Sequence, residues 1–207
     1  MTADRPNVQG QYLFHLTDRT AMFIQTEQTP NPATLKFLPG RTVLASGTAN
    51  FSDAAAAARS PLATKLFGLP GVEGVFLGYD FVTVTKSNDQ DWYQLKPSIL
   101  GAIMESFTTG QPIMIDDHPS GGTPASTAAE GDSELVVQIK ELIDTRVRPA
   151  VAQDGGDIVF HRFEDGVVYL EMHGSCSGCP SSTATLKAGI ENMLRHYIPE
   201  VQAVQSV

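Results

Sequence analysis

The alternation of apolar and polar positions divides the chain into two structured parts separated by a polar stretch. In the first part, residues 23–28, 33–38, 72–77 and 81–85 follow the two-residue period of strands. Residues 61–67 and 90–107 follow the helical period, with Pro97 expected near the start of the longer helix. The order β-β-α-β-β-α predicts a compact α+β domain over residues 22–115.

The second part, residues 133–207, shows a different order of elements. A helix is expected after Ser133, a plausible N-cap, and Pro149 is expected to end it. Strands at 158–163 and 167–172 flank a Glu-Asp-Gly turn, which predicts a hairpin. A helix at about 180–196 and a short strand at 201–207 complete the order α-β-β-loop-α-β. The fold class is therefore α+β, with two small layered domains.

Residues 116–132 join these parts. The segment contains proline, glycine and serine together with four acids and no basic residue, and it has almost no apolar side chain to bury. This composition predicts a flexible acidic linker. Residues 1–21 show no strand or helix period, and we interpret them as an extension, either disordered or an artefact.

The net charge of the chain and the length of its apolar runs restrict the possible functions. The formal net charge is −9, which argues against nonspecific binding to nucleic acid, because phosphates are held by clustered basic residues. The apolar runs are shorter than the roughly 20 residues of a membrane helix, so we expect no membrane partner. The acid-containing start is unlike a mitochondrial presequence, which favours bacterial cytoplasm, with the mitochondrial matrix as the alternative.

The two cysteines of the chain, Cys176 and Cys179, are three positions apart and form a C-x-x-C sequence. Gly174 and Gly178 allow the backbone to turn tightly and are expected to leave the sulfurs exposed. The helix expected after Pro180 places Cys179 near a helix N-terminus, which lowers the pKa of a thiol. Both cysteines are therefore candidate metal and cofactor ligands, in a protein of a reducing compartment.

A C-x-x-C alone leaves several functions open. A zinc site needs four ligands, and the nearest further donors, His161 and His173, are more simply half-exposed strand residues. A thioredoxin-like dithiol oxidoreductase has a larger parallel βαβ context, whereas a hairpin precedes the loop here. An iron–sulfur cluster takes four cysteine ligands, so a chain with two would share the cluster with a second copy.

Two sets of motifs carry a resemblance. Residues 154–157 (DGGD) and 174–182 (GSCSGCPSS) resemble the NifU-like C-terminal domain of the Nfu family, which comprises iron–sulfur cluster scaffold and carrier proteins. Residues 22–27 (MFIQTE), 29–37 (TPNPATLKF) and 39–40 (PG) resemble the N-terminal domain of that family. From the residues alone, the DGGD sequence is interpreted as a tight turn capped by its aspartates.

The resemblance implies a function without substrate turnover. It implies that Cys176 and Cys179 of two subunits hold a bridging 4Fe–4S cluster, so that the homodimer forms on cluster binding. It also implies apo iron–sulfur proteins as acceptors and the upstream assembly machinery as donor. The alternatives are a dithiol oxidoreductase with a reversible Cys176–Cys179 disulfide and a zinc-bridged interaction module.

Overall fold

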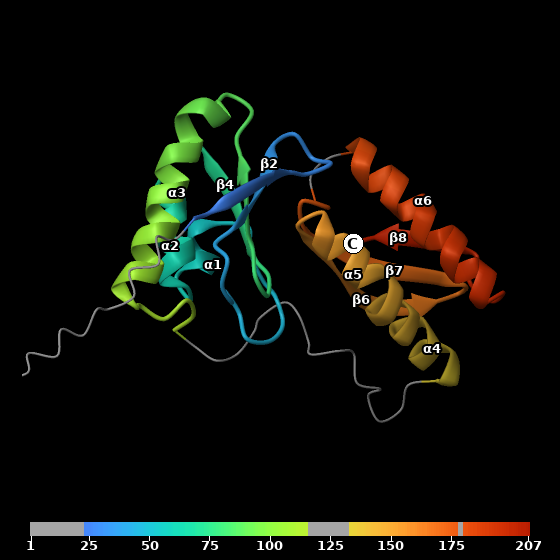
Figure 1. The fold of residues 1–207 in the computed structure, drawn as a ribbon. Coiled ribbons are helices and arrows are strands. Elements are labelled where there is room, and N and C mark those ends of the chain that lie inside the picture. Colours follow the sequence, from blue (N-terminus) through green and yellow to red (C-terminus); the bar gives the residue numbers. More distant parts are fainter. Residues whose placement is uncertain (1–22, 116–132, 178–179) are drawn as a thin grey trace, which may run out of the picture.

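The computed structural model describes residues 23–115, 133–177 and 180–207, and the side chains of 180–182 are outside the description. These residues form two α+β domains, each with a hydrophobic core of its own (Figure 1). The predicted extension at 1–21 and the predicted linker at 116–132 lie outside the described residues. The longest described helices are too short or too polar to cross a membrane.

The N-terminal domain is built on a five-stranded sheet. Its elements are, in chain order, β1 (Gln25–Gln28), β2 (Thr34–Leu38), β3 (Ala49–Phe51), α1 (Ala54–Ala57), α2 (Pro61–Phe67), β4 (Val72–Leu77), β5 (Val82–Lys86) and α3 (Trp92–Thr109). The strand order is β1-β2-β5-β4-β3, and all neighbours are antiparallel. The predicted strands and helices are present, but the sequence pattern missed β3, whose three residues are too few to show a period.

Local sequence explains where these helices begin and end. Ser60 accepts a hydrogen bond from the Ala63 amide at 3.1 Å, and Pro61 occupies the first turn of α2. Asp91 caps α3 in the same way, and Gly110 ends that helix with a φ of 67°.

One face of the N-terminal sheet is covered by the three helices. The core between them contains Phe37, Phe51 and Val84 from the strands and Leu62 and Ile99 from the helices. The opposite face carries no helix of this domain and is turned toward the C-terminal domain (Figure 1).

The C-terminal domain begins with a helix of three segments, which are α4 (Glu134–Leu142), a π-helical turn η1 (Ile143–Val147) and α5 (Arg148–Gln153). Ser133 caps α4 as predicted. The expectation that Pro149 ends this helix is wrong, because the chain stays helical to Gln153. In the π turn the Arg148 amide bonds the Ile143 carbonyl, five residues back. This wider turn moves the preceding carbonyls, with which a proline ring would otherwise clash.

A three-stranded sheet follows. Strand β6 (Gly156–Glu164) pairs antiparallel with β7 (Val167–Gly174), and β8 (Ala203–Ser206) pairs with β7 in parallel after helix α6 (Pro180–Tyr197). The predicted hairpin is confirmed, with Asp165 and Gly166 at positive φ in its turn. The unit β7-α6-β8 is a parallel βαβ crossover, which the sequence pattern did not predict.

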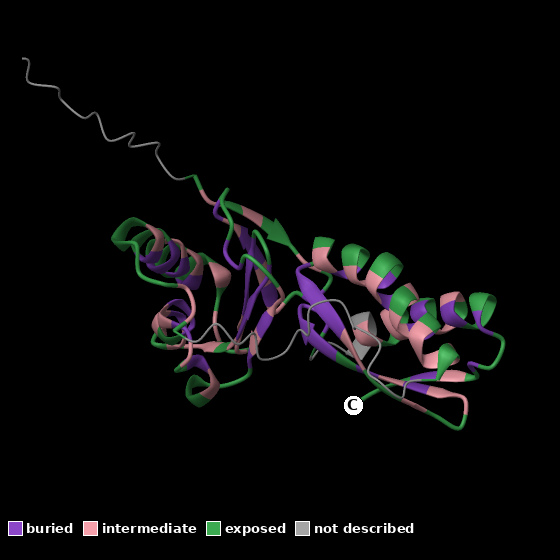
Figure 2. Ribbon diagram, turned by 90° about the horizontal axis from the view of Figure 1, so that it is seen from below, coloured by how far each residue is buried: buried purple, intermediate pink, exposed green. Residues whose placement is uncertain are grey.

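The two domains face each other through their strands. Figure 2 shows buried residues concentrated on the strands of both domains where the domains meet. Strands β4 and β5 of the first domain contact β7 of the second, close to the end of β7 that leads into the cysteine loop.

Candidate functional site

The cysteine loop, residues 175–179, connects the end of β7 to the start of α6. Its described part is held by short-range hydrogen bonds. The Ser177 amide and hydroxyl both donate to the Gly174 carbonyl, at 3.2 and 2.9 Å, and Thr183 of α6 donates to the Cys176 carbonyl at 3.0 Å. Gly178 and Cys179 lie outside the described residues, so the position of Cys179 stays a prediction.

The DGGD sequence forms the seat of this loop. Gly156 pairs with Gly174 across the sheet, and the Ser175 amide donates to the Gly155 carbonyl at 3.2 Å. A Cβ atom added to Gly156 would lie 2.6 Å from the Cys176 sulfur, so the missing side chain makes room for the thiol. The turn interpretation is right for Gly155, whose φ is 83°, but it missed this contact with the cysteine loop.

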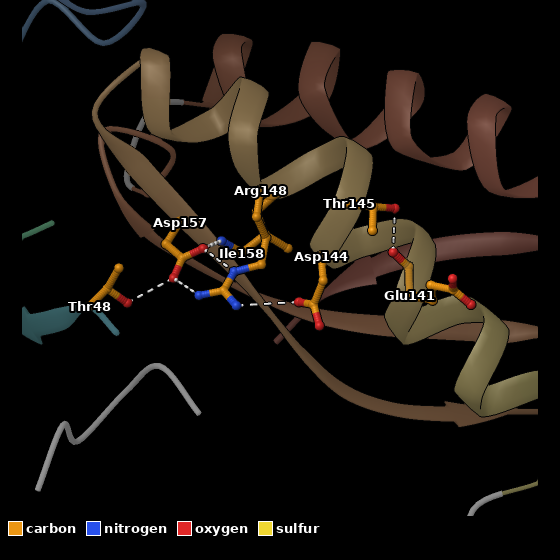
Figure 3. A network of polar contacts seen from close by, with 7 residues as sticks. All are labelled: Thr48, Glu141, Asp144, Thr145, Arg148, Asp157 and Ile158. Atoms are coloured by element: carbon orange, nitrogen blue, oxygen red, sulfur yellow. Dashed lines mark hydrogen bonds and ion pairs between the residues drawn. The ribbon is translucent and has the colours of Figure 1, made fainter. Parts of the chain in front are cut away.

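Asp157 is buried and pairs with a basic residue instead of capping the turn. Both carboxylate oxygens accept from the Arg148 guanidinium at 2.8 Å, and Oδ1 also accepts from the Ile158 amide at 2.8 Å. Asp144 binds the same guanidinium at 3.3 Å, and Thr48 of the N-terminal domain donates to Asp157 at 2.7 Å (Figure 3). These carboxylates raise the pKa of Arg148, chiefly through the hydrogen bonds that the guanidinium donates to Asp157.

The Cys176 thiol lies inside the domain, against the expectation of an exposed sulfur. The residue is 5% exposed and packs in the core with Ile158, Met172 and Ile190. Burial raises the pKa of this thiol to about 11, and nearby Asp154 and Asp157 act in the same direction, while a hydrogen bond with Ser175 opposes them. The raised pKa favours the protonated thiol at neutral pH.

The two candidate histidines do not join the cysteine in a metal site within the described residues. His161 is exposed on β6, whereas His173 is 4% exposed, so the half-exposed expectation is wrong for His173. The Nε2 atom of His173 lies 2.8 Å from Glu171, and Nδ1 has no hydrogen-bond partner among the described residues. Within residues 23–115, 133–177 and 180–207, no group of three or more His, Cys, Asp or Glu side chains is arranged to hold a metal ion.

Sequence comparison decides the family. The family described as "Scaffold protein Nfu/NifU N terminal" matches residues 24–110, and the "NifU-like domain" matches residues 139–205. This chain belongs to the Nfu family. The resemblance drawn from the motifs is therefore confirmed, and the two Nfu-family domains coincide with the two cores described above.

Named relatives support the same assignment. The human "NFU1 iron-sulfur cluster scaffold homolog, mitochondrial" is 54% identical over 187 residues, which cover 90% of this chain and 72% of the human protein. The Arabidopsis thaliana "NifU-like protein 4, mitochondrial" is 51% identical over 189 residues, covering 90% and 66% of the respective chains. A solution NMR structure of a NifU-like protein from Saccharomyces cerevisiae is 25% identical, with a TM-score of 0.43, and covers 54% of this chain and all of that one. The compartment in the relatives' names favours the mitochondrial alternative over the bacterial cytoplasm.

Arg148 is a site residue that sequence reasoning missed. It lies nine positions before Asp157 and directly before Pro149, the residue at which the helix was expected to end. The helical period of residues 139–151, if continued through the proline, would have placed its side chain near the DGGD turn.

Proposed function

We propose that this Nfu-family chain carries an iron–sulfur cluster and passes it to apo-proteins. The thiolates of Cys176 and Cys179 from two chains would together hold one 4Fe–4S cluster. The observation that supports the proposal most strongly is the C-x-x-C between β7 and α6 of a NifU-like domain, since each chain offers two thiols where a cluster takes four. The cluster is cargo, so this function turns over no substrate.

The delivery step is an exchange of thiolates at iron. An acceptor thiol loses its proton and binds iron, and the Cys176 or Cys179 sulfur that it displaces takes a proton. Because the protonated Cys176 is stable inside the domain, its return to the core would favour release of the cluster. The buried position of Cys176 would therefore help a carrier to release its cluster.

The names of the relatives support the proposed acceptors. Proteins called iron–sulfur cluster scaffolds are consistent with apo iron–sulfur proteins as acceptors, and we propose an upstream assembly system as donor. We also propose a mitochondrial location, which those names carry. The N-terminal domain would contribute to recognising acceptors, so deleting residues 1–132 should preserve cluster binding by the separate C-terminal core but slow delivery to some acceptors.

Anaerobic reconstitution tests the central claim. We expect about four iron and four sulfide per two chains, together with the mass of a dimer. Cys176→Ala and Cys179→Ala should each lose the stable cluster and stay monomeric, whereas the control Ser206→Ala, at an exposed position of β8, should keep both the cluster and the dimer. A cluster held by single chains, or equal iron in Cys176→Ala and wild type, would contradict the proposal.

A dithiol oxidoreductase is the second candidate, and one observation favours it. The parallel β7-α6-β8 unit supplies the βαβ context that the sequence pattern lacked. The raised pKa of Cys176 argues against it, because a buried protonated thiol is a poor nucleophile. Thiol trapping in a redox titration with a disulfide substrate separates the two functions, and metal analysis of the anaerobic protein separates both from a zinc-bridged module.

A further inference from the structure

The helix-free face of the N-terminal sheet is covered by the other domain of the same chain. Lys36, Phe76 and Thr83 lie on this face and are buried, although the helices α1, α2 and α3 cover the opposite one. A Cβ atom added to Gly155 would lie 3.0 Å from the Thr83 hydroxyl, and one added to Gly174 would lie 3.1 Å from the Phe76 ring. The covering elements are therefore the DGGD seat and the end of β7.

The polar contacts across this interface have one direction. Four hydrogen bonds between described residues cross it, and in each the N-terminal domain donates and the C-terminal domain accepts. They run from Asn31 Nδ2 to the Ser177 carbonyl (3.1 Å), from Lys36 Nζ to the Gln153 carbonyl (2.9 Å), from Thr48 Oγ1 to Asp157 Oδ2 (2.7 Å) and from Thr83 Oγ1 to the Gly155 carbonyl (2.8 Å).

These acceptors surround the cysteine loop. The Gly155 carbonyl that binds Thr83 also binds the Ser175 amide, and Ser177 follows Cys176 directly in the chain. The N-terminal face thus holds the seat of the loop and the loop itself. Two loops that share one cluster must come within a few ångströms of each other, and this face contacts Gly174 and bonds Ser177, with a hollow of only about 280 Å³ left beside them.

The same interface is suited to opening. Four hydrogen bonds contribute to it beside the contact of the Phe76 ring, and polar domain interfaces separate readily. It is also flanked by two hollows, one of about 280 Å³ between Phe76 and Ser177 and one of about 320 Å³ between Thr48 and Arg148. Water that enters these hollows can replace the crossing hydrogen bonds one at a time.

We propose that the helix-free face is a docking surface for the cysteine loop of its own chain, and that this face must release the loop before a second copy can share a cluster. The second half of this statement rests on the proposed function. The N-terminal domain is then a cap, closed in the metal-free monomer and open in the cluster-bridged dimer.

Lys36 reports directly on the cap. Its ammonium group is buried, bonding the Gln153 carbonyl of the C-terminal domain and pairing with Glu27 of its own domain, so the full-length metal-free protein should react slowly there with an amine-specific acylating reagent, as read by mass spectrometry. Lys65, whose side chain is 31% exposed, serves as the internal reference. We expect the rate at Lys36 relative to Lys65 to rise about tenfold on cluster loading, since opening removes the cover. An unchanged ratio in a cluster-loaded dimer would overturn the cap.

A variant opens the cap without metal. The double substitution Thr48→Val and Thr83→Val removes two crossing bonds at nearly constant volume, and it should raise Lys36 acylation several-fold in the metal-free protein. Thr34→Val is the matched control, because the Thr34 hydroxyl bonds Thr85 within the N-terminal domain. Equal acylation of the double variant and the control would refute the docking surface. If wild type bound no iron and sulfide, the proposed function would fail, while the metal-free comparison would still decide the docking surface.

Discussion

The two domains differ in what their cores contain. The N-terminal core includes the buried rings of Phe37 and Phe51 and no cysteine, whereas the fully buried part of the C-terminal core is aliphatic apart from Met172 and the Cys176 thiol. Under the proposed function, Cys176 would have to leave this core to bind the cluster. The comparison then teaches that the N-terminal core can stay unchanged through the proposed cycle, while the C-terminal core would repack around the space that the sulfur leaves.

Truncations in the two cores give the largest expected effects. Phe51→Ala should lower the stability of the N-terminal domain by about 3–5 kcal/mol, and Leu170→Ala that of the C-terminal domain by about 2–5 kcal/mol, because each leaves a cavity at a fully buried position. Calorimetry should show each variant shifting mainly the transition of its own domain. A single transition that moves equally in both variants would mean that the two cores unfold as one.

The buried ion pair offers a sharper test of the C-terminal side. Asp157→Asn should cost roughly 2–4 kcal/mol, because it removes the charge that Arg148 binds through two hydrogen bonds. The matched control is Glu164→Gln, which breaks an exposed pair with Arg162 and should cost less than about 1 kcal/mol. Denaturant unfolding measures both, and equal costs would show that burial adds nothing to the Asp157 pair.

The Cys176 thiol predicts a pH effect that the N-terminal domain lacks. Its pKa is raised by burial to about 11, so the unfolded chain releases this proton first as the pH increases. The stabilisation is complete below about pH 9 and is lost between pH 9 and 11, with a magnitude of roughly 1–3 kcal/mol. Urea titrations across this range should show the loss in wild type and a shallower slope in Cys176→Ala. The same slope in both proteins would assign the effect to another group.

The smallest expected effect concerns the contact between the domains. Thr48→Val removes one hydrogen bond to Asp157, whose oxygens still bind Arg148, and should cost about 1 kcal/mol or less. Hydrogen exchange of residues 156–158 should quicken slightly, with both core transitions unchanged. A loss as large as that of Asp157→Asn would show that the domains are energetically one unit.

Much of the fold could be predicted from the sequence where periods were long or turns were distinctive. Helices α2 and α3 were predicted from the helical period of their apolar residues, and the Asp165–Gly166 turn from the Glu-Asp-Gly sequence between two strands. Strand β3 was missed because three residues carry no period. The continuation through Pro149 was missed because the π turn before it depends on packing of the whole helix, which no local pattern reports.

For the site, the sequence predicted the chemistry of the two cysteines but not the buried position of Cys176. The spacing of Cys176 and Cys179 points to a metal or redox site, and the family comparison agrees with that choice of function class. The inward position of the Cys176 sulfur could not be predicted, since it depends on Gly156 from a strand twenty residues earlier in the chain. The packing of the N-terminal domain against the cysteine loop could not be predicted either. It depends on Lys36, Phe76 and Thr83, which have the pattern of ordinary strand residues.

The bare backbone at Gly156 has a consequence for anyone reading a mutational scan of this chain. One methyl group placed there would collide with the Cys176 sulfur and push it out of its niche. Under the proposed function, such a variant would lower metal retention, although Gly156 donates nothing to the metal. A screen that scores only the colour of the protein would therefore count Gly156 among the ligands. Its substitution would in fact act by displacing the Cys176 sulfur.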